Sequence, residues 1–146
     1  MTTTDRPSLL YAVKQVELAV RARLDEVLRP TGVTTQQYTA LTVLARRDGM
    51  TSAELARHSF VTAQTMTDLV AALERRGLIT RRSDPAHGRR IAISLSDAGR
   101  ELLAELSEPV AAVEQRMIGR LSAAEREELH DVLNRCRAAL TTDAPV

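Results

Sequence analysis

The chain has 146 residues, a formal net charge of +1, one cysteine and only three aromatic side chains. This length suits one domain, and the scarcity of aromatic residues predicts a mainly α protein with a core of Leu, Val, Ile, Ala and Met. One cysteine excludes an internal disulfide framework, and no apolar run approaches the ~18 residues that a membrane span needs. The N-terminus lacks a signal-peptide pattern, so a cytoplasmic protein is expected.

An apolar stripe near the N-terminus predicts a long first helix. Between residues 8 and 29, apolar residues recur at spacings of three and four, as on one face of an amphipathic helix: Leu9, Val13, Val16, Val20, Leu24 and Val27. Pro30 and Gly32 end the pattern. A helix of this length must bury its stripe against another element.

Three further helix starts follow, each with a threonine able to act as N-cap. Two of them have Gln or Glu three residues later, which is the spacing of a capping box: Thr34 with Gln37 and Thr51 with Glu54. The third, Thr62, is an N-cap without such a partner. The helix after Thr51 is short and ends in a turn at Ser59 and Phe60. Two helices joined by a tight turn indicate a helix-turn-helix.

The helix that starts after Thr62 has one apolar face and one face of small polar residues. Its predicted inward face is Met66, Leu69, Val70 and Leu73. Gly77 is placed to close the helix as its C′ residue. Residues 78–82 and 91–95 are then predicted as two strands joined by the tip SDPAHGRR, which completes the layout of a winged helix-turn-helix.

Positive charge gathers in this middle stretch. Residues 50–95 contain seven arginines and four acidic residues, a net of +3, whereas the remaining residues contain 13 basic and 15 acidic side chains, a net of −2. This segregation is expected if the middle of the chain meets phosphate and the flanks do not.

Two more amphipathic helices are predicted after the hairpin. The first starts at Ser96, and Pro109 within it is expected to kink it near residues 105–109. The second starts at a capping box of Ser122 and Glu125 and carries Cys136 on its apolar stripe, where a buried structural cysteine is expected rather than a redox sensor.

The long helices at both ends can bury their stripes in two ways. They can fold back on the middle module, or they can pair with the same helices of a second chain. The second arrangement fits a winged helix-turn-helix, because a two-fold dimer presents two recognition helices to half-sites about 10 bp apart.

The order of these elements resembles the MarR family of transcriptional regulators. The matching segments are TSAELARHSFVTAQTMTDLVAALERRGLITR at residues 51–81 and DPAHGRRIAISLSDAG at residues 84–99. The resemblance implies a mainly α fold with a small β-wing: a single domain over residues 1–146, with a DNA-binding lobe at 34–95 and dimerisation helices at 8–29 and 96–141. It also implies a homodimeric repressor or activator that binds a pseudo-palindrome in double-stranded DNA.

The expected DNA-binding residues lie on the recognition helix and on the wing. A face of short polar side chains at a helix N-terminus suits entry into the major groove. The helix residues are Thr62, Ala63, Gln64, Thr65, Thr67, Asp68 and Arg75. The wing residues are His87, Arg89 and Arg90, and the resemblance gives minor-groove insertion to Arg89, six residues before Leu95.

Two residues depart from the family pattern. Members commonly carry an acidic residue at the position of His87, two before the wing arginine, so Asp84 is the alternative partner inside this wing. Many members also carry a basic residue at the position of Asp68. A carboxylate facing DNA can accept a hydrogen bond from cytosine N4, so a different operator is expected.

Relatives often release DNA when a small phenolic or other aromatic compound binds between the lobe and the dimerisation helices. Tyr11 and Tyr38 are the candidate ligand residues near that junction, and core packing is the alternative role for both. The three histidines lack the spacing of a metal site, and no metal or other cofactor is expected.

An enzyme is not expected, because no carboxylate pair, Cys/His pair or phosphate loop is found. The alternative function is an architectural DNA-binding protein, or a helical interaction protein, without an effector response. The specificity ratio for one palindrome separates that alternative from a regulator.

Overall fold

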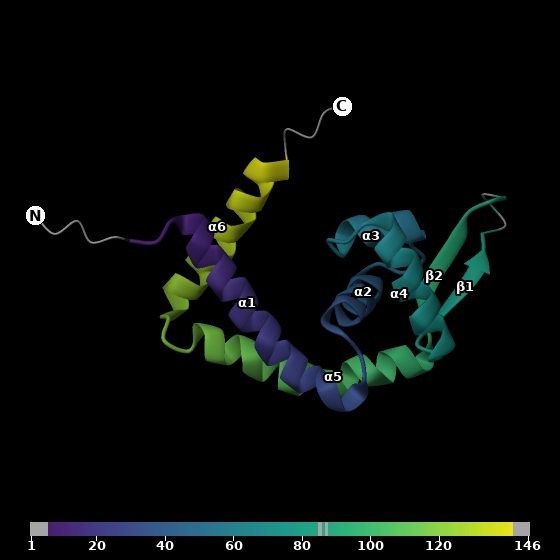
Figure 1. The fold of residues 1–146 in the computed structure, drawn as a ribbon, viewed down its shortest axis with the longest axis horizontal. Coiled ribbons are helices and arrows are strands. Elements are labelled where there is room, and N and C mark those ends of the chain that lie inside the picture. Colours follow the sequence, from purple (N-terminus) through teal and green to yellow (C-terminus); the bar gives the residue numbers. More distant parts are fainter. Residues whose placement is uncertain (1–5, 85, 87, 142–146) are drawn as a thin grey trace, which may run out of the picture. The chain divides into compact units, whose positions relative to one another are not determined.

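A computed structural model describes residues 6–84, 86 and 88–141 of the chain (Figure 1). In chain order its elements are α1 (Leu9–Leu28), the 3-10 helix η1 (Arg29–Thr31), α2 (Thr35–Arg46), α3 (Ser52–His58), α4 (Ala63–Arg75), β1 (Ile79–Ser83), β2 (Ile91–Leu95), α5 (Asp97–Ile118) and α6 (Ala123–Thr141). The expected mainly α fold with a small β-wing is therefore confirmed. The chain divides into two compact units, one up to Ala111 and one from Ala112 onward.

The helix starts follow the capping chemistry that the sequence indicates. The Thr34 side chain accepts the Gln37 N–H at 3.1 Å, and the Gln37 side chain accepts the Thr34 N–H at 3.0 Å, which completes a capping box. Ser122 and Glu125 form the same reciprocal pair, with bonds of 2.9 and 3.1 Å. Hydrogen bonds from the backbone and the side chain of Ser122 lower the pKa of the Glu125 carboxyl.

The end of α4 explains why the first strand starts one residue later than predicted. Gly77 adopts a φ of +71° and donates its N–H to the Glu74 carbonyl at 2.9 Å, and the Leu78 N–H reaches the Leu73 carbonyl at 3.0 Å. These two bonds form a Schellman motif. Because Leu78 belongs to this helix cap, β1 begins at Ile79.

The hairpin is fastened to the connection between α2 and α3. Its two strands pair antiparallel, with Ile79 opposite Leu95. On the other side of β2, the Ile93 N–H donates to the Met50 carbonyl at 2.8 Å, and the Gly49 N–H donates to the Ile93 carbonyl at 3.1 Å. The short Met50 bridge therefore acts as a third, minimal strand beside the middle of β2.

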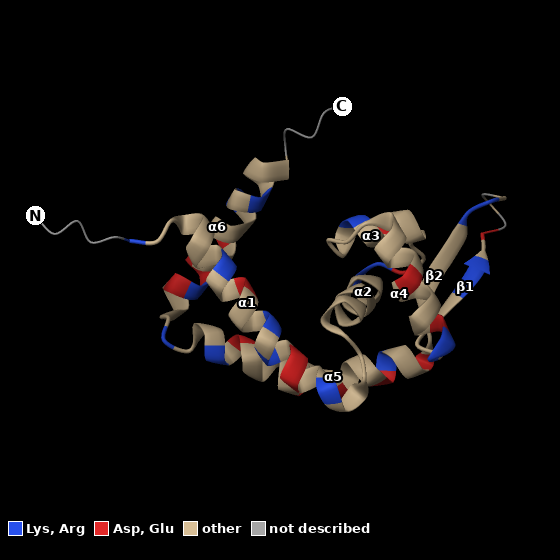
Figure 2. Cartoon of the chain, viewed as in Figure 1, with Lys and Arg blue, Asp and Glu red and all other residues tan. Residues whose placement is uncertain are grey.

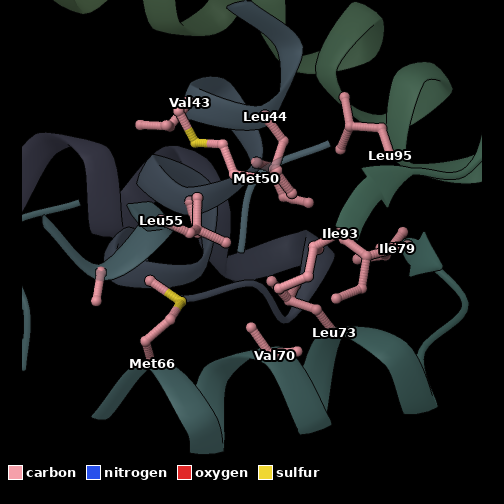
Figure 3. Close-up of a cluster of buried hydrophobic side chains, with 14 of the residues drawn as sticks. Val43, Leu44, Met50, Leu55, Met66, Val70, Leu73, Ile79, Ile93 and Leu95 are labelled. Carbon is pink, nitrogen blue, oxygen red and sulfur yellow. The ribbon is translucent and has the colours of Figure 1, made fainter. Parts of the chain in front are cut away.

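One aliphatic core holds the lobe together. Met66, Val70 and Leu73 project from α4 toward Leu55 on α3 and Ile93 on β2 (Figure 3). The expected inward face of α4 is confirmed, with Leu69 partly buried against the same cluster. Burial of this kind contributes about 1.5–3 kcal/mol for each large aliphatic side chain.

The first turns of α5 lie tightly against the strands. A Cβ placed on Gly99 would lie 2.3 Å from the carbonyl oxygen of Leu78 and 3.2 Å from the Leu95 side chain. The Leu78 carbonyl also accepts the Ser96 N–H at 3.1 Å. Gly99 therefore allows a backbone approach that any side chain would prevent.

The long terminal helices keep much of their apolar surface exposed. α5 contains Pro109 and continues unbroken to Ile118, and the kink expected there stays a prediction. No residue of α6 is buried, and Cys136 is exposed, so its expected burial is wrong for the single chain. Large exposed apolar residues on these helices include Leu9, Leu10, Val13, Val16, Leu18, Met117, Leu133 and Leu140. Within the described ranges, no helix has the length and apolar character needed to span a bilayer.

Candidate nucleic-acid interface

The helix-turn-helix is formed by α3, a tight turn and α4. The Ala56 carbonyl accepts hydrogen bonds from the N–H groups of both Ser59 and Val61, each at 3.2 Å, and these two hydrogen bonds close the turn. Between them Phe60 adopts a φ of +62°, and the residue is 85% exposed. A non-glycine residue with a left-handed backbone conformation is destabilised by about 1–3 kcal/mol, and burial of the Phe60 ring does not offset this strain.

The N-terminus of α4 presents hydroxyl groups whose protons are already used. The Thr62 hydroxyl caps the helix by accepting the Thr65 N–H at 3.1 Å and also donates to the Thr65 hydroxyl at 3.0 Å. The Thr67 hydroxyl donates to the Ala63 carbonyl at 3.0 Å. Both Thr62 and Thr67 can therefore offer DNA mainly acceptor lone pairs.

Gln64 differs from these threonines. It is exposed, and its side-chain amide forms no hydrogen bond to any residue in the described part of the chain. An amide can both donate and accept, as bidentate pairing with adenine requires. Asp68 and Arg75 are also exposed on α4, away from its buried face. The seven residues expected on the recognition helix thus lie at its N-cap or on its solvent-facing sides.

The seven arginines of residues 50–95 form two groups. Three have partners inside the protein: Arg76 donates to the Thr31 carbonyl at 2.6 Å, Arg81 pairs with Glu74, and Arg90 pairs with Glu54. In the part of the chain that the structure describes, the other four have no such partner: Arg57, Arg75, Arg82 and Arg89. Figure 2 shows basic residues along β1 and on the segment that leads into β2. The four arginines without an internal partner are the ones whose charge is available to a phosphate group.

Among the described residues of the wing tip, Asp84, the alternative partner for the wing arginine, forms no ion pair with Arg89. The Asp84 carboxylate accepts the Ala86 N–H at 3.0 Å, which makes a local turn instead of a bond to Arg89. Arg89 is exposed. His87, the third residue expected on the wing, lies outside the described residues. Arg89 is therefore an exposed cation of the tip without a partner among the described residues.

Glu74 and Arg81 join the end of α4 to β1 through a two-bond fork. The guanidinium donates from Nε and Nη2 to the two carboxylate oxygens, at 3.0 Å each. The hydrogen bond from Arg81 lowers the pKa of the Glu74 carboxyl and raises the pKa of the arginine. The fork is exposed, so its contribution is screened by solvent.

This fork predicts a pH-dependent contribution to stability. Because the pKa of Glu74 is lowered in the folded protein, its contribution is complete above the ordinary glutamate pKa, about 4.3, and is lost as the pH falls through the folded value. Glu74→Gln should therefore melt below the parent at neutral pH and approach it in acid. Thermal midpoints measured from pH 7 to about pH 3 test this, with Glu101→Gln as the matched exposed control. Two parallel curves would contradict it.

A cavity of about 490 Å³ lies between α1, the start of α2 and the helix-turn-helix turn. Its lining residues are Glu17, Val20, Arg21, Leu24, Thr34, Thr35, Gln36, Thr39, Ser59, Phe60 and Val61. Neither Tyr11 nor Tyr38 lines it. Tyr11 is exposed, whereas Tyr38 packs against the core, and desolvation raises the pKa of its hydroxyl.

Sequence reasoning missed the residues of this cavity. The sequence predicts only a turn at Ser59 and Phe60, because neither the burial of Ser59 nor the positive φ of Phe60 can be read from residue types. One signal was present, because Phe60 is one of only three aromatic residues and stands in a tight polar turn. Composition thus singles out this residue, but one exposed aromatic side chain does not by itself indicate a binding site.

Comparisons with known proteins agree with this geometry. A family model described as "MarR family" matches residues 31–90. The HTH-type transcriptional repressor Rv2887 of Mycobacterium tuberculosis is 31% identical over 135 residues, which cover 92% of this chain and 97% of that protein. The chain belongs to the MarR family.

Solved structures of MarR proteins have the same fold. S. aureus MepR, solved in its DNA-binding conformation, aligns with a TM-score of 0.83 and 26% identity over 92% of this chain and 100% of MepR. Rv2887 in complex with salicylic acid aligns with a TM-score of 0.73 and 31% identity, covering 90% and 98% of the two chains. The present chain is thus a MarR-family DNA-binding transcriptional regulator with a winged helix fold.

Proposed function

We propose that this MarR protein is a homodimeric repressor of the bacterial cytoplasm that binds a pseudo-palindromic operator. In each half-site, the N-terminal face of α4 enters the major groove and Arg89 enters the adjacent minor groove. The observation that carries this proposal is that the Gln64 amide at the start of α4 has no hydrogen-bond partner among the described residues, whereas the hydroxyls of Thr62 and Thr67 beside it are already bonded within the helix. The unpaired arginines of the same lobe supply the phosphate contacts.

Exposed apolar surface supports the dimer. α1 presents Leu9, Leu10 and Val13 at 84, 82 and 60% exposure, and α6 presents Leu140 at 85%. A second copy that pairs these helices would bury both stripes and would also cover Cys136. In this organisation residues 34–95 form the DNA-binding lobe, and residues 8–29 and 96–141 form the dimerisation helices.

Selection of bound sequences from random double-stranded DNA tests the proposal. A homodimeric regulator should enrich one pseudo-palindrome with half-site centres about 10 bp apart. Gln64→Ala should relax the preference at one position of each half-site. A pool that stays unenriched while the protein still binds DNA would favour the architectural alternative.

The cavity beside the turn supports a response to a small aromatic acid or phenol. Ser59 is 4% exposed, and its hydroxyl, which lies at the cavity, has no hydrogen-bond partner among the described residues. Phe60 supplies a ring, and Arg21 supplies a cation that pairs with Glu17. Because Thr62 caps α4 directly after this turn, a ligand that favours a different turn conformation would weaken DNA binding by that difference in affinity.

Salicylate is a suitable probe, because the relative Rv2887 has been crystallised with salicylic acid. Titration calorimetry should show binding to the parent protein and weaker binding to Ser59→Ala and Phe60→Ala. A gel-shift titration should show that salicylate raises the operator Kd of the parent. Equal salicylate affinity in all three proteins would exclude the cavity as the effector site.

A further inference from the structure

The Glu54 side chain on α3 does not complete the capping box expected with Thr51, because within the described residues no bond joins it to the Thr51 N–H; its carboxylate forms a charged cluster instead. Its Oε1 lies 3.1 Å from Arg90 Nη2, and its Oε2 lies 3.5 Å from Arg47 Nη2. The Thr51 hydroxyl also donates to Oε1, at 3.2 Å. The carboxylate side chain is 17% exposed, so it has left most of its water and depends on these partners.

Arg90 connects this cluster to the wing. Its guanidinium also donates to the Gly49 carbonyl at 3.3 Å, so the side chain holds both α3 and the connection before it. Its own carbonyl accepts the Asp84 N–H at 2.8 Å, just beyond the paired strands. Fixing Arg90 therefore fixes the outer end of the hairpin, next to Arg89.

The other described residues of the tip offer no comparable support. The Asp84 carboxylate is occupied by the Ala86 N–H, and Arg89 has no partner within the described residues. The middle of β2 is held separately by the Met50 bridge to Ile93. Among the described residues, the pair of Arg90 and Glu54 is thus the side-chain contact that ties the outer end of the hairpin to α3.

We propose that Glu54, acting through Arg90, is a positioning residue for DNA binding. It holds the wing in the orientation from which Arg89 enters the minor groove, so that the tip is ordered before DNA arrives. Arg90 then serves as the anchor and Arg89 as the DNA contact. This assignment rests on the proposed function, because it gives the anchored wing a DNA-binding role. Preorganisation of this kind increases affinity by reducing the ordering cost of binding.

The direction in which Glu54→Gln changes the operator Kd distinguishes a positioning role from a general effect of charge. Glu54→Gln removes a negative charge from a protein that binds a polyanion, so charge alone would tighten DNA binding. The anchor predicts the opposite, an operator Kd raised by roughly tenfold as the tip loses its support. An unchanged or lower Kd for Glu54→Gln would overturn the proposal.

A double-mutant cycle tests whether the two residues act together. Arg90→Met keeps most of the aliphatic stem and removes the guanidinium. If Arg90 works through Glu54, the double variant should bind the operator no more weakly than the worse single variant. Additive losses would show that Arg90 contacts DNA independently, and would overturn the anchor.

Amide exchange in the free protein separates failure of the anchor from failure of the proposed function. Glu54→Gln and Arg90→Met should each speed exchange of the Asp84 amide several-fold. The Ile93 amide, bonded to Met50, should keep its protection and so report an intact lobe. Arg82→Met, which removes an unpartnered arginine of β1, is the matched control and should leave Asp84 unchanged. Unchanged Asp84 exchange in both variants would overturn the anchor, whereas loss of DNA binding by the parent would overturn only the function.

Discussion

Arg89→Ala is expected to weaken operator binding by roughly 1–3 kcal/mol in each half-site, and so by about thirtyfold or more for the dimer. The exposed guanidinium has no partner in the described part of the protein, so its removal leaves the wing intact and removes only a DNA contact. Affinity for unrelated sequences should fall as well, because a narrow minor groove attracts the charge whatever bases line it.

Gel-shift or anisotropy titrations over a range of salt concentrations measure this effect. The slope of log Kd against log salt should become shallower for Arg89→Ala. Lys14→Ala, which removes one positive charge from α1, serves as the control and should change the affinity little. Parent-like operator binding by Arg89→Ala would disprove the assignment of this residue to the minor groove.

Gly99→Ala is expected to lower the stability of the fold strongly, although it adds only one methyl group. The added Cβ would lie 2.3 Å from the Leu78 carbonyl oxygen, which belongs to the backbone and cannot rotate away. Relief requires α5 to move from the strands, which would also stretch the bond from Ser96 to that carbonyl. Overpacking costs typically 1–3 kcal/mol, and occasionally more where backbone must shift.

Urea unfolding of Gly99→Ala beside Ala98→Gly measures this cost. Ala98 is the exposed neighbour in the same helical turn, so its replacement reports only helix propensity, about 1 kcal/mol. An alanine normally stabilises a helix relative to glycine. A Gly99→Ala variant as stable as the parent would therefore show that α5 can shift without cost.

Much of the fold followed from local rules. The N-caps at Thr34, Thr62 and Ser122 depend on contacts within one turn, which residue spacing encodes directly. The inward face of α4 follows from helical periodicity. The shift of β1 to Ile79 was not predictable in the same way, because Leu78 could serve either as the last cap residue or as the first strand residue.

The site was only partly predictable, because its decisive contacts join distant segments. Arg89 and Arg90 are neighbours of identical chemistry, and nothing in their sequence indicates that only Arg90 meets a carboxylate of α3. The same limit applied to Asp84, whose turn competes with the ion pair expected of it. Tyr11 and Tyr38, the effector residues expected from their amphipathic side chains, do not line the cavity, which is formed by residues of α1, α2 and the turn.

The arginines of β1 have a second consequence, for self-association of the wing. β2 lies between β1 and the Met50 bridge, so β1 is the outer strand of the sheet and presents unpaired backbone groups to solvent. Exposed strand edges of this kind recruit other strands and promote aggregation. Arg81 is neutralised by its fork with Glu74, so Arg82 is the unpartnered positive charge of this edge within the described residues. Two copies approaching edge to edge would bring their Arg82 charges together and repel each other. Arg82 thus also opposes edge-to-edge pairing of two wings while no DNA is bound.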